Sequence, residues 1–214
     1  MSTAAHDGRT WTPEVGVVNG LYAFKPWYAH RLGSIVDIAA ARDISPDLFS
    51  LVGVLGAAVA AVGIARGWWL VAAAALAVRL AGANLDGAVA RASGRSRPWG
   101  FVVNELGDRA SDLLMFVGLA ALAARDGWTS PAVLLVCTAA VASTLPTFVS
   151  LAAAAASDDV VRLNGGPLGK TERCALAVLA AAVPGWLPVI AVVIVAGSLV
   201  TAAVRLTAAY RELR

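Results

Sequence analysis

Charged residues are scarce in this chain. Only 14% of its 214 residues are Asp, Glu, Lys or Arg and 59% are hydrophobic, whereas a soluble domain carries about 25% charged residues. The chain has only two cysteines, Cys137 and Cys174, and their spacing fits neither a metal-binding nor a redox motif. These shortages exclude an ordinary soluble domain and a disulfide scaffold, and the mean hydropathy of +0.73 indicates an integral membrane protein.

We expect no secretory leader, because residues 1–13 are polar and have no apolar core. The net charge is +3. In so apolar a chain this basic surplus favours anionic lipid headgroups or phosphate-bearing substrates, and no nucleic-acid partner is expected. We divide the chain into a polar tail (1–16), an interfacial amphipathic segment (17–44) and a membrane domain (45–214).

Six hydrophobic runs are each near the roughly 20 residues that a helix needs to cross a bilayer. They cover residues 46–65, 68–89, 101–123, 131–156, 173–187 and 189–209. The expected fold class is therefore an all-α polytopic membrane protein with a six-transmembrane-helix bundle. Most Lys and Arg residues fall on one side of these spans, while Arg66 and Arg125 fall on the other, so we expect both ends to face the cytoplasm.

The segment before the first span mixes aromatic, basic and apolar residues. Ile35, Ile38 and Ala39 recur at helical spacing beside Arg31 and Asp37. Such a mixture suits the headgroup layer and predicts an amphipathic helix lying in the membrane interface. An ordinary cytoplasmic helix is the alternative.

A glycine-marked acidic cluster lies where the second span ends and the third begins. It reads Asp86-Gly87-x-x-Ala90-Arg91, then eight residues, then Gly100-x-x-x-Asn104-Glu105-x-x-Asp108-Arg109-x-x-Asp112. A carboxylate at mid-membrane costs roughly 2.5–3.5 kcal/mol, so several together indicate a functional site. On a helix, Asn104, Asp108 and Asp112 recur at i, i+4 and i+8. Glu105 is also in phase with the two aspartates, at i, i+3 and i+7, so either set can share one face.

Carboxylates beside arginines at a membrane surface suit a hard cation that holds a diphosphate. Mg²⁺ prefers oxygen ligands and shares them readily with phosphates. Two such ions can clamp the entering and leaving oxygens of a phosphoryl transfer. Two other interpretations stay open: an intramembrane salt-bridge network around Glu105 and Arg109, and an ion-coupled transporter.

A second basic site is predicted in residues 164–173, between the fourth and fifth spans. Its glycines allow a tight loop, and Lys170 and Arg173 stand at the start of the next helix. A helix N-terminus with basic side chains attracts phosphate. The alternative is a basic loop that merely obeys the orientation rule.

The acidic cluster resembles the signature of the CDP-alcohol phosphotransferases, D-x-x-D-G-x-x-A-R-(x8)-G-x-x-x-D-x-x-x-D. Six of its eight fixed positions are present: Asp86, Gly87, Ala90, Arg91, Gly100 and Asp108. The Tyr-x-x-Lys-Pro-aromatic segment at residues 22–27 and the turn at residues 45–47 are also similar to members of this family.

The resemblance implies a transferase of phospholipid biosynthesis, which joins an alcohol to the phosphatidyl group of a CDP-linked lipid and releases CMP. It implies that Asp86 and Asp108 bind Mg²⁺ or Mn²⁺, with Asp108 also acting as general base. Nucleotide contacts are implied at Gly87, Ala90, Arg91 and Gly100. Further candidates are Asn104, Glu105 and Asp112 for the metal, and Arg109, Lys170 and Arg173 for an acceptor phosphate. A homodimer in a bacterial cytoplasmic membrane is also implied.

Two positions depart from the signature. Ala83 stands where the first aspartate would be, and Asn104 replaces the third. Since alanine offers no ligand and asparagine only a neutral oxygen, we expect one bound ion rather than two. The sequence does not name the alcohol acceptor. A catalytically inactive relative that binds lipid or nucleotide is the alternative function.

Overall fold

The computed structural model describes residues 25–127, 130–157, 163 and 165–214, and all the regular structure in this part is helical. The helices are α1 (Lys25–Ala41), α2 (Pro46–Arg66), α3 (Trp69–Ala92), α4 (Pro98–Arg125), α5 (Ser130–Ala142), α6 (Leu145–Ala156), α7 (Lys170–Ala182), the 3₁₀ turn η2 (Pro184–Trp186) and α8 (Leu187–Glu212). The predicted all-α class is confirmed.

Within the described residues, four segments are long and apolar enough to cross a membrane. They are Pro46–Arg66, Trp69–Ala92, Pro131–Ala156 and Pro184–Glu212. The predicted count of six is not confirmed. The predicted span 101–123 lies within α4, where the acidic cluster lowers the hydropathy. The predicted span 173–187 corresponds to α7, which has only 13 residues and therefore rises about 20 Å, less than a hydrocarbon core of about 30 Å.

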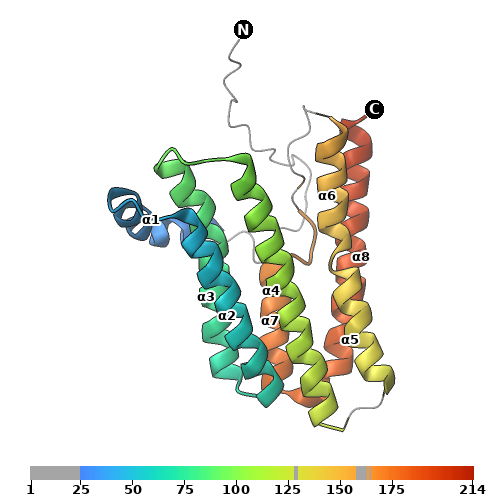
Figure 1. Cartoon of the computed structure of the whole chain (residues 1–214). Helices are drawn as coiled ribbons and strands as arrows, with labels where there is room; N and C mark the ends of the chain where they lie inside the picture. Colours follow the sequence, from blue (N-terminus) through green and yellow to red (C-terminus); the bar gives the residue numbers. More distant parts are fainter. Residues whose placement is uncertain (1–24, 128–129, 158–162, 164) are drawn as a thin grey trace.

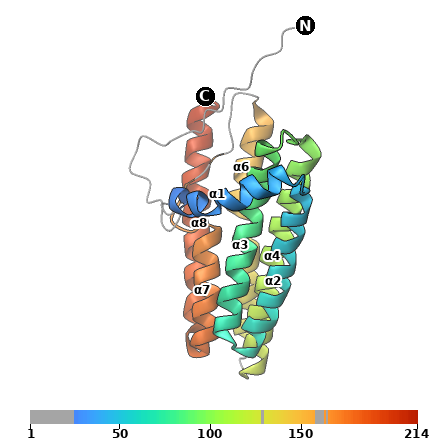
Figure 2. The same ribbon diagram turned by 90° about the vertical axis from the view of Figure 1, so that its left-hand side faces the viewer.

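The helices from α2 onward run side by side as a bundle, and α1 lies across it near its upper end (Figures 1 and 2). In the same views α7 fills only the lower part of the bundle, and the C-terminal end of α8 rises to the upper end. The predicted span 131–156 is divided into α5 and α6 just before Pro146, because proline cannot donate the helical hydrogen bond.

Helix α2 packs closely against both α3 and α4. A Cβ atom on Gly82 of α3 would lie 2.6 Å from the carbonyl oxygen of Phe49, and one on Gly118 of α4 would lie 2.7 Å from that of Ala61. Both distances are too short for a side chain. These glycines therefore let the three helix backbones approach one another.

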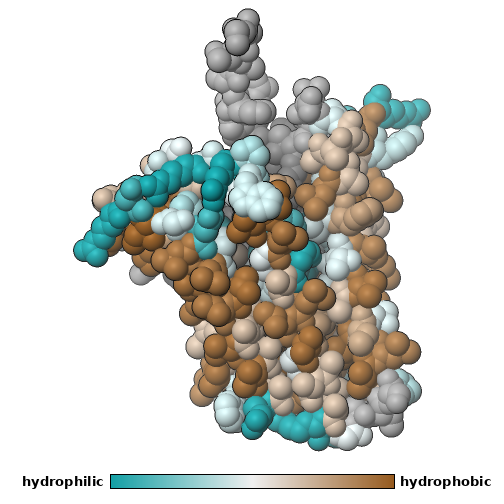
Figure 3. All heavy atoms as spheres, in the orientation of Figure 1, coloured by the Kyte–Doolittle hydropathy of each residue, from teal (hydrophilic) through white to brown (hydrophobic). Residues whose placement is uncertain are grey.

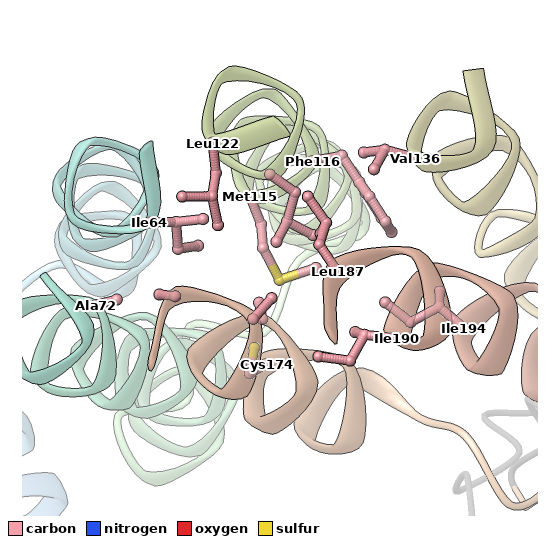
Figure 4. Close-up of a cluster of buried hydrophobic side chains, with 14 of the residues drawn as sticks. Ile64, Ala72, Met115, Phe116, Leu122, Val136, Cys174, Leu187, Ile190 and Ile194 are labelled. Carbon is pink, nitrogen blue, oxygen red and sulfur yellow. The ribbon is translucent and has the colours of Figure 1, made fainter. Parts of the chain in front are cut away.

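A cluster of buried hydrophobic side chains forms a core between the helices (Figure 4). Ile64 of α2, Met115 of α4, Cys174 of α7 and Ile194 of α8 point into it, and each is nearly inaccessible to solvent. Cys174 therefore packs as a small apolar residue. Cys137 does not, because α5 turns it outward, where it is exposed.

The face of the bundle seen in Figure 3 is mostly apolar along its length and carries polar residues at both ends. On α1, Ile35 and Ile38 are 43% and 53% exposed while Ala39 is buried. This distribution suits a helix in the headgroup layer, although an interfacial location stays a prediction. Residues 17–24 of the predicted segment lie outside the described part.

Candidate functional site

One small hollow between α2, α3 and α4 collects three of the predicted metal ligands. Asp86 of α3 lines it together with Asn104 and Asp108 of α4. The rest of the lining is Ser50, Gly53, Arg79, Ala83, Gly107 and Ser111. The two carboxylates are buried, with 5% and 8% exposure. The short connection between α3 and α4 reverses the chain, so the two halves of the motif face each other.

Asp86 is held by donors on two sides. The Ser50 hydroxyl of α2 donates a 2.7 Å hydrogen bond to Oδ2, and the Gly87 backbone N–H donates one of 2.6 Å to Oδ1. These bonds orient the carboxylate within the hollow. Sequence reasoning missed Ser50, because nothing in an apolar helix distinguishes a site serine from a packing serine.

Asp108 forms an ion pair with Lys170, the first residue of α7. Burial lowers the pKa of the Lys170 ammonium from its usual value, and the neighbouring Asp108 carboxylate opposes that shift. The basic loop and the acidic motif were predicted as separate sites 62 residues apart. Their contact makes them two walls of one site.

Asp112 lies in a cluster of arginines beside the hollow. Its carboxylate contacts Arg79 at 2.5 Å, Arg173 at 2.8 Å and Arg109 at 3.3 Å. Arg109 also lies 3.6 Å from Glu105. The salt-bridge network weighed as an alternative is therefore present, but it is centred on Asp112. It lies beside the hollow and does not replace it.

The donor set of the hollow suits one divalent ion. It offers the carboxylates of Asp86 and Asp108 and the amide oxygen of Asn104, while Ala83 contributes no ligand. Among the described residues, no group of three or more His, Cys, Asp and Glu side chains is arranged to hold a metal. A single Mg²⁺ or Mn²⁺ fits this set if substrate phosphate or water supplies its remaining oxygens. Glu105 and Asp112 do not line the hollow and stay candidate ligands by prediction only.

The predicted nucleotide contacts lie around the upper part of the site. A Cβ on Gly87 would be 3.2 Å from a guanidinium nitrogen of Arg91, and one on Gly100 would be 3.4 Å from Cγ of Arg97. Ala90 is half-buried and Arg91 is exposed. Both glycines therefore give arginine side chains room beside the backbone.

The other two basic residues of the α3–α4 connection are engaged elsewhere. Arg95 pairs with Asp43 and Arg97 with Asp47. These exposed ion pairs tie the connection to the turn between α1 and α2, which holds Asp43, and to the first turn of α2, which holds Asp47. They hold the upper edge of the site in place. Arg91, in contrast to Arg95 and Arg97, lies beside Gly87 of the motif.

Arg79 is the other site residue that the sequence analysis did not identify. It is only 1% exposed, and it both lines the hollow and binds Asp112. A single arginine within a hydrophobic run was a signal for a functional position, but only the tertiary contact with Asp112 shows where it points.

The fold and the site together define the class of this protein. It is a helical membrane bundle with an acidic hollow between α2, α3 and α4. No family model matches the chain. The phosphatidylinositol phosphate synthase of Cutibacterium acnes is 29% identical over 119 residues, which cover 51% of this chain and 55% of that protein. The matched part thus spans about half the length of this curated relative.

Crystal structures of Mycobacterium tuberculosis phosphatidylinositol phosphate synthase have the same fold. The structure with CDP-DAG bound matches with a TM-score of 0.69 and 24% identity, covering 83% of this chain and 92% of that one. The structure with manganese and citrate matches with a TM-score of 0.68 and 23% identity, covering 83% and 88%. The resemblance predicted from the motif is confirmed as a similarity: the chain resembles one phosphatidylinositol phosphate synthase in sequence and another in fold.

Proposed function

We propose that this protein transfers the phosphatidyl group of a CDP-linked lipid to an alcohol and releases CMP. The observation that carries the proposal is that Asp86, Asn104 and Asp108 line one hollow, while Lys170 pairs with Asp108. Two structures of the Mycobacterium tuberculosis synthase support it, because one contains CDP-DAG and the other contains manganese and citrate.

Asp86, Asn104 and Asp108 would hold one Mg²⁺ or Mn²⁺ against the diphosphate of the donor lipid. The ion would neutralise charge on the diphosphate oxygens. Arg91, which lies beside Gly87 on the same helix, would neutralise more of that charge. The missing side chains at Gly87 and Gly100 leave room for the nucleotide to approach the backbone.

Asp108 would take the proton of the acceptor hydroxyl. The hydroxyl oxygen then bonds to the phosphorus of the phosphatidyl group, and the bond from that phosphorus to CMP breaks, with its electron pair leaving on CMP. A positioned base typically contributes roughly 10²–10⁴-fold to such a rate. The ion pair with Lys170 would hold this carboxylate in place until the acceptor arrives.

The acceptor is proposed to be a phosphorylated alcohol of the inositol class. Both relatives are phosphatidylinositol phosphate synthases, and this site has a basic wall that suits an acceptor phosphate. Lys170 pairs with Asp108, and Arg173 and Arg109 pair with Asp112, so these three residues would form that wall. An acceptor phosphate bound there would place its sugar hydroxyls near Asp108.

The test is release of CMP from CDP-diacylglycerol by the purified protein in detergent, with Mn²⁺ or Mg²⁺ and inositol phosphate, glycerol phosphate or serine. We expect CMP only with a divalent ion, and most with inositol phosphate. Asp108→Asn should lower the rate at least 10²-fold while CDP still binds. If no acceptor supports CMP release and Asp108→Asn changes nothing measurable, the protein is instead an inactive relative that binds lipid or nucleotide.

A further inference from the structure

Arg79 lines the hollow, but the proposed reaction gives it no role. It lies mid-way along α3, one helical turn before Ala83, and both residues line the hollow. Its side chain is 1% exposed. A charged residue inside an apolar helix is costly and usually marks a ligand or ion position. Pairing with Asp112 explains the charge of Arg79 but not its place at the hollow.

The hydrogen bonds of Arg79 leave one donor without a partner. Its Nη2 donates to Oδ1 of Asp112 at 2.5 Å, and its Nη1 contacts Sγ of Cys174 at 3.5 Å. Its Nε is buried and has no hydrogen-bond partner among the described residues. An unpaired buried N–H is destabilising unless a ligand or water satisfies it. Because Arg79 lines the hollow, an acceptor bound there would be placed to satisfy this donor.

The charges around this part of the hollow favour an anion over a second cation. Ala83 offers no carboxylate between Arg79 and Asp86, and Asn104 across the hollow is neutral. A second divalent ion placed here would lie beside the Arg79 guanidinium, and neither Ala83 nor Asn104 would supply it with a carboxylate ligand. A phosphate oxygen would instead find a planar donor group suited to it.

We infer that Arg79 binds an anionic phosphate oxygen of a substrate through its free N–H, and that its charge takes the place of a second divalent ion. The inference rests on the proposed function. The phosphate belongs either to the diphosphate of the CDP-linked donor or to a phosphorylated acceptor, which share this chemistry. Arg79 is thus a substrate-binding residue of the site.

Two variants test the inference independently. Arg79→Lys keeps a cation beside Asp112 but removes the guanidinium N–H. Ala83→Asp leaves Arg79 in place and puts a carboxylate one turn away, where it would pair with the free N–H; Ala83→Asn controls for its bulk. Titration calorimetry in detergent with Mn²⁺ measures the binding of CDP and, separately, of inositol phosphate. Electron paramagnetic resonance counts Mn²⁺ per chain in the presence of CDP.

We expect Arg79→Lys and Ala83→Asp each to weaken the same probe by about tenfold or more, with one Mn²⁺ per chain throughout. Weaker CDP binding assigns the contact to the donor, and weaker inositol phosphate binding assigns it to the acceptor. Unchanged affinity for both probes in the two variants would overturn the inference. So would a second Mn²⁺ in Ala83→Asp, or equal losses in both Ala83 variants with Arg79→Lys unaffected. If Arg79→Lys does not fold, Ala83→Asp decides.

The same preparations separate this inference from the proposed function. If the wild-type protein releases no CMP but the two variants bind the phosphate probes more weakly than it does, the transferase proposal fails and the role of Arg79 stands. Wild-type protein that releases CMP, with phosphate binding unchanged in both variants, would do the reverse.

Discussion

At the scale of single residues, the site divides its aspartates between two tasks. Asp86 and Asp108 line the hollow, while Asp112 is surrounded by Arg79, Arg109 and Arg173. We expect Asp112→Asn to destabilise the fold by about 3–5 kcal/mol, because it leaves buried guanidinium groups without their counter-ion. Thermal unfolding in detergent measures this loss.

Asp86→Asn is the matched control for that variant. It also removes one buried carboxylate, but an asparagine oxygen can still accept from the Gly87 amide, and the Ser50 hydroxyl can turn to accept from the new amide nitrogen. We expect nearly unchanged thermal stability together with loss of Mn²⁺ binding. If the two substitutions lower the unfolding temperature equally, Asp112 does not stabilise the fold more than Asp86 does, and the division of tasks is wrong.

Lys170 is expected to act on the acceptor more than on the chemical step. Lys170→Ala should raise the KM for inositol phosphate by about tenfold and change the KM for CDP-diacylglycerol little, because the ammonium offers binding energy to an acceptor phosphate. Steady-state CMP release at varied acceptor concentration measures the effect. Lys170→Arg is the control and should retain most of the affinity. A loss confined to kcat would contradict this assignment.

Residue spacing was enough to predict that Asp86, Asn104 and Asp108 belong together, since one short turn joins their helices. It could not place Asp112 or Lys170. On a helical wheel Asp112 is in phase with Asp108, yet four residues of rise carry it past the hollow to the arginines. Lys170 meets Asp108 only because α7 starts part-way down the bundle, which depends on packing across 62 residues.

At the scale of the elements, hydropathy predicted where the helices lie in the sequence but not how many of them are long and apolar enough to cross a membrane. The runs predicted as spans correspond to α2, α3, α4, the α5–α6 pair, α7 and α8. Helix α4 carries Asp108 and Asp112, and α7 carries Lys170 and Arg173, so both helices contribute charged residues to the site. A hydropathy average counts each charged residue as unfavourable in a membrane, but ion pairs between helices offset part of that free-energy cost.

The contact of α2 with α3 depends on glycine at one position. We expect Gly82→Ala to destabilise the bundle by about 1–3 kcal/mol, since its Cβ would lie 2.6 Å from the Phe49 carbonyl oxygen. Thermal unfolding in detergent measures this. Gly185→Ala is the control, because a Cβ there meets nothing within 4 Å. If both variants unfold at the wild-type temperature, the helices do not need this close approach.

At the scale of the whole molecule, the apolar sides of the bundle leave room for a second copy beside the lipid. Exposed residues such as Val59, Leu113 and Phe148 cover several helices, and small-residue surfaces allow membrane helices to pack. We expect a homodimer, as the family resemblance implies. Native mass spectrometry from mild detergent measures the assembly, and a uniform monomer would contradict it.

The orientation of the molecule is the last expectation, and it joins the charge pattern to the fold. In Figure 1 the α3–α4 connection and the C-terminal end lie at the upper end of the bundle, and the α4–α5 connection lies at the lower end. Arg91, Arg95 and Arg211 lie at that upper end, so it should face the cytoplasm. In a background with Cys137→Ser and Cys174→Ala, we expect Ser96→Cys and Glu212→Cys to resist a membrane-impermeant maleimide in intact cells, and Asp126→Cys to react. Labelling of Ser96→Cys and Glu212→Cys from opposite sides would contradict the helix arrangement. Labelling of both from outside would invert the orientation, and with it the cytoplasmic access of a CDP-linked substrate to Asp86 and Asp108.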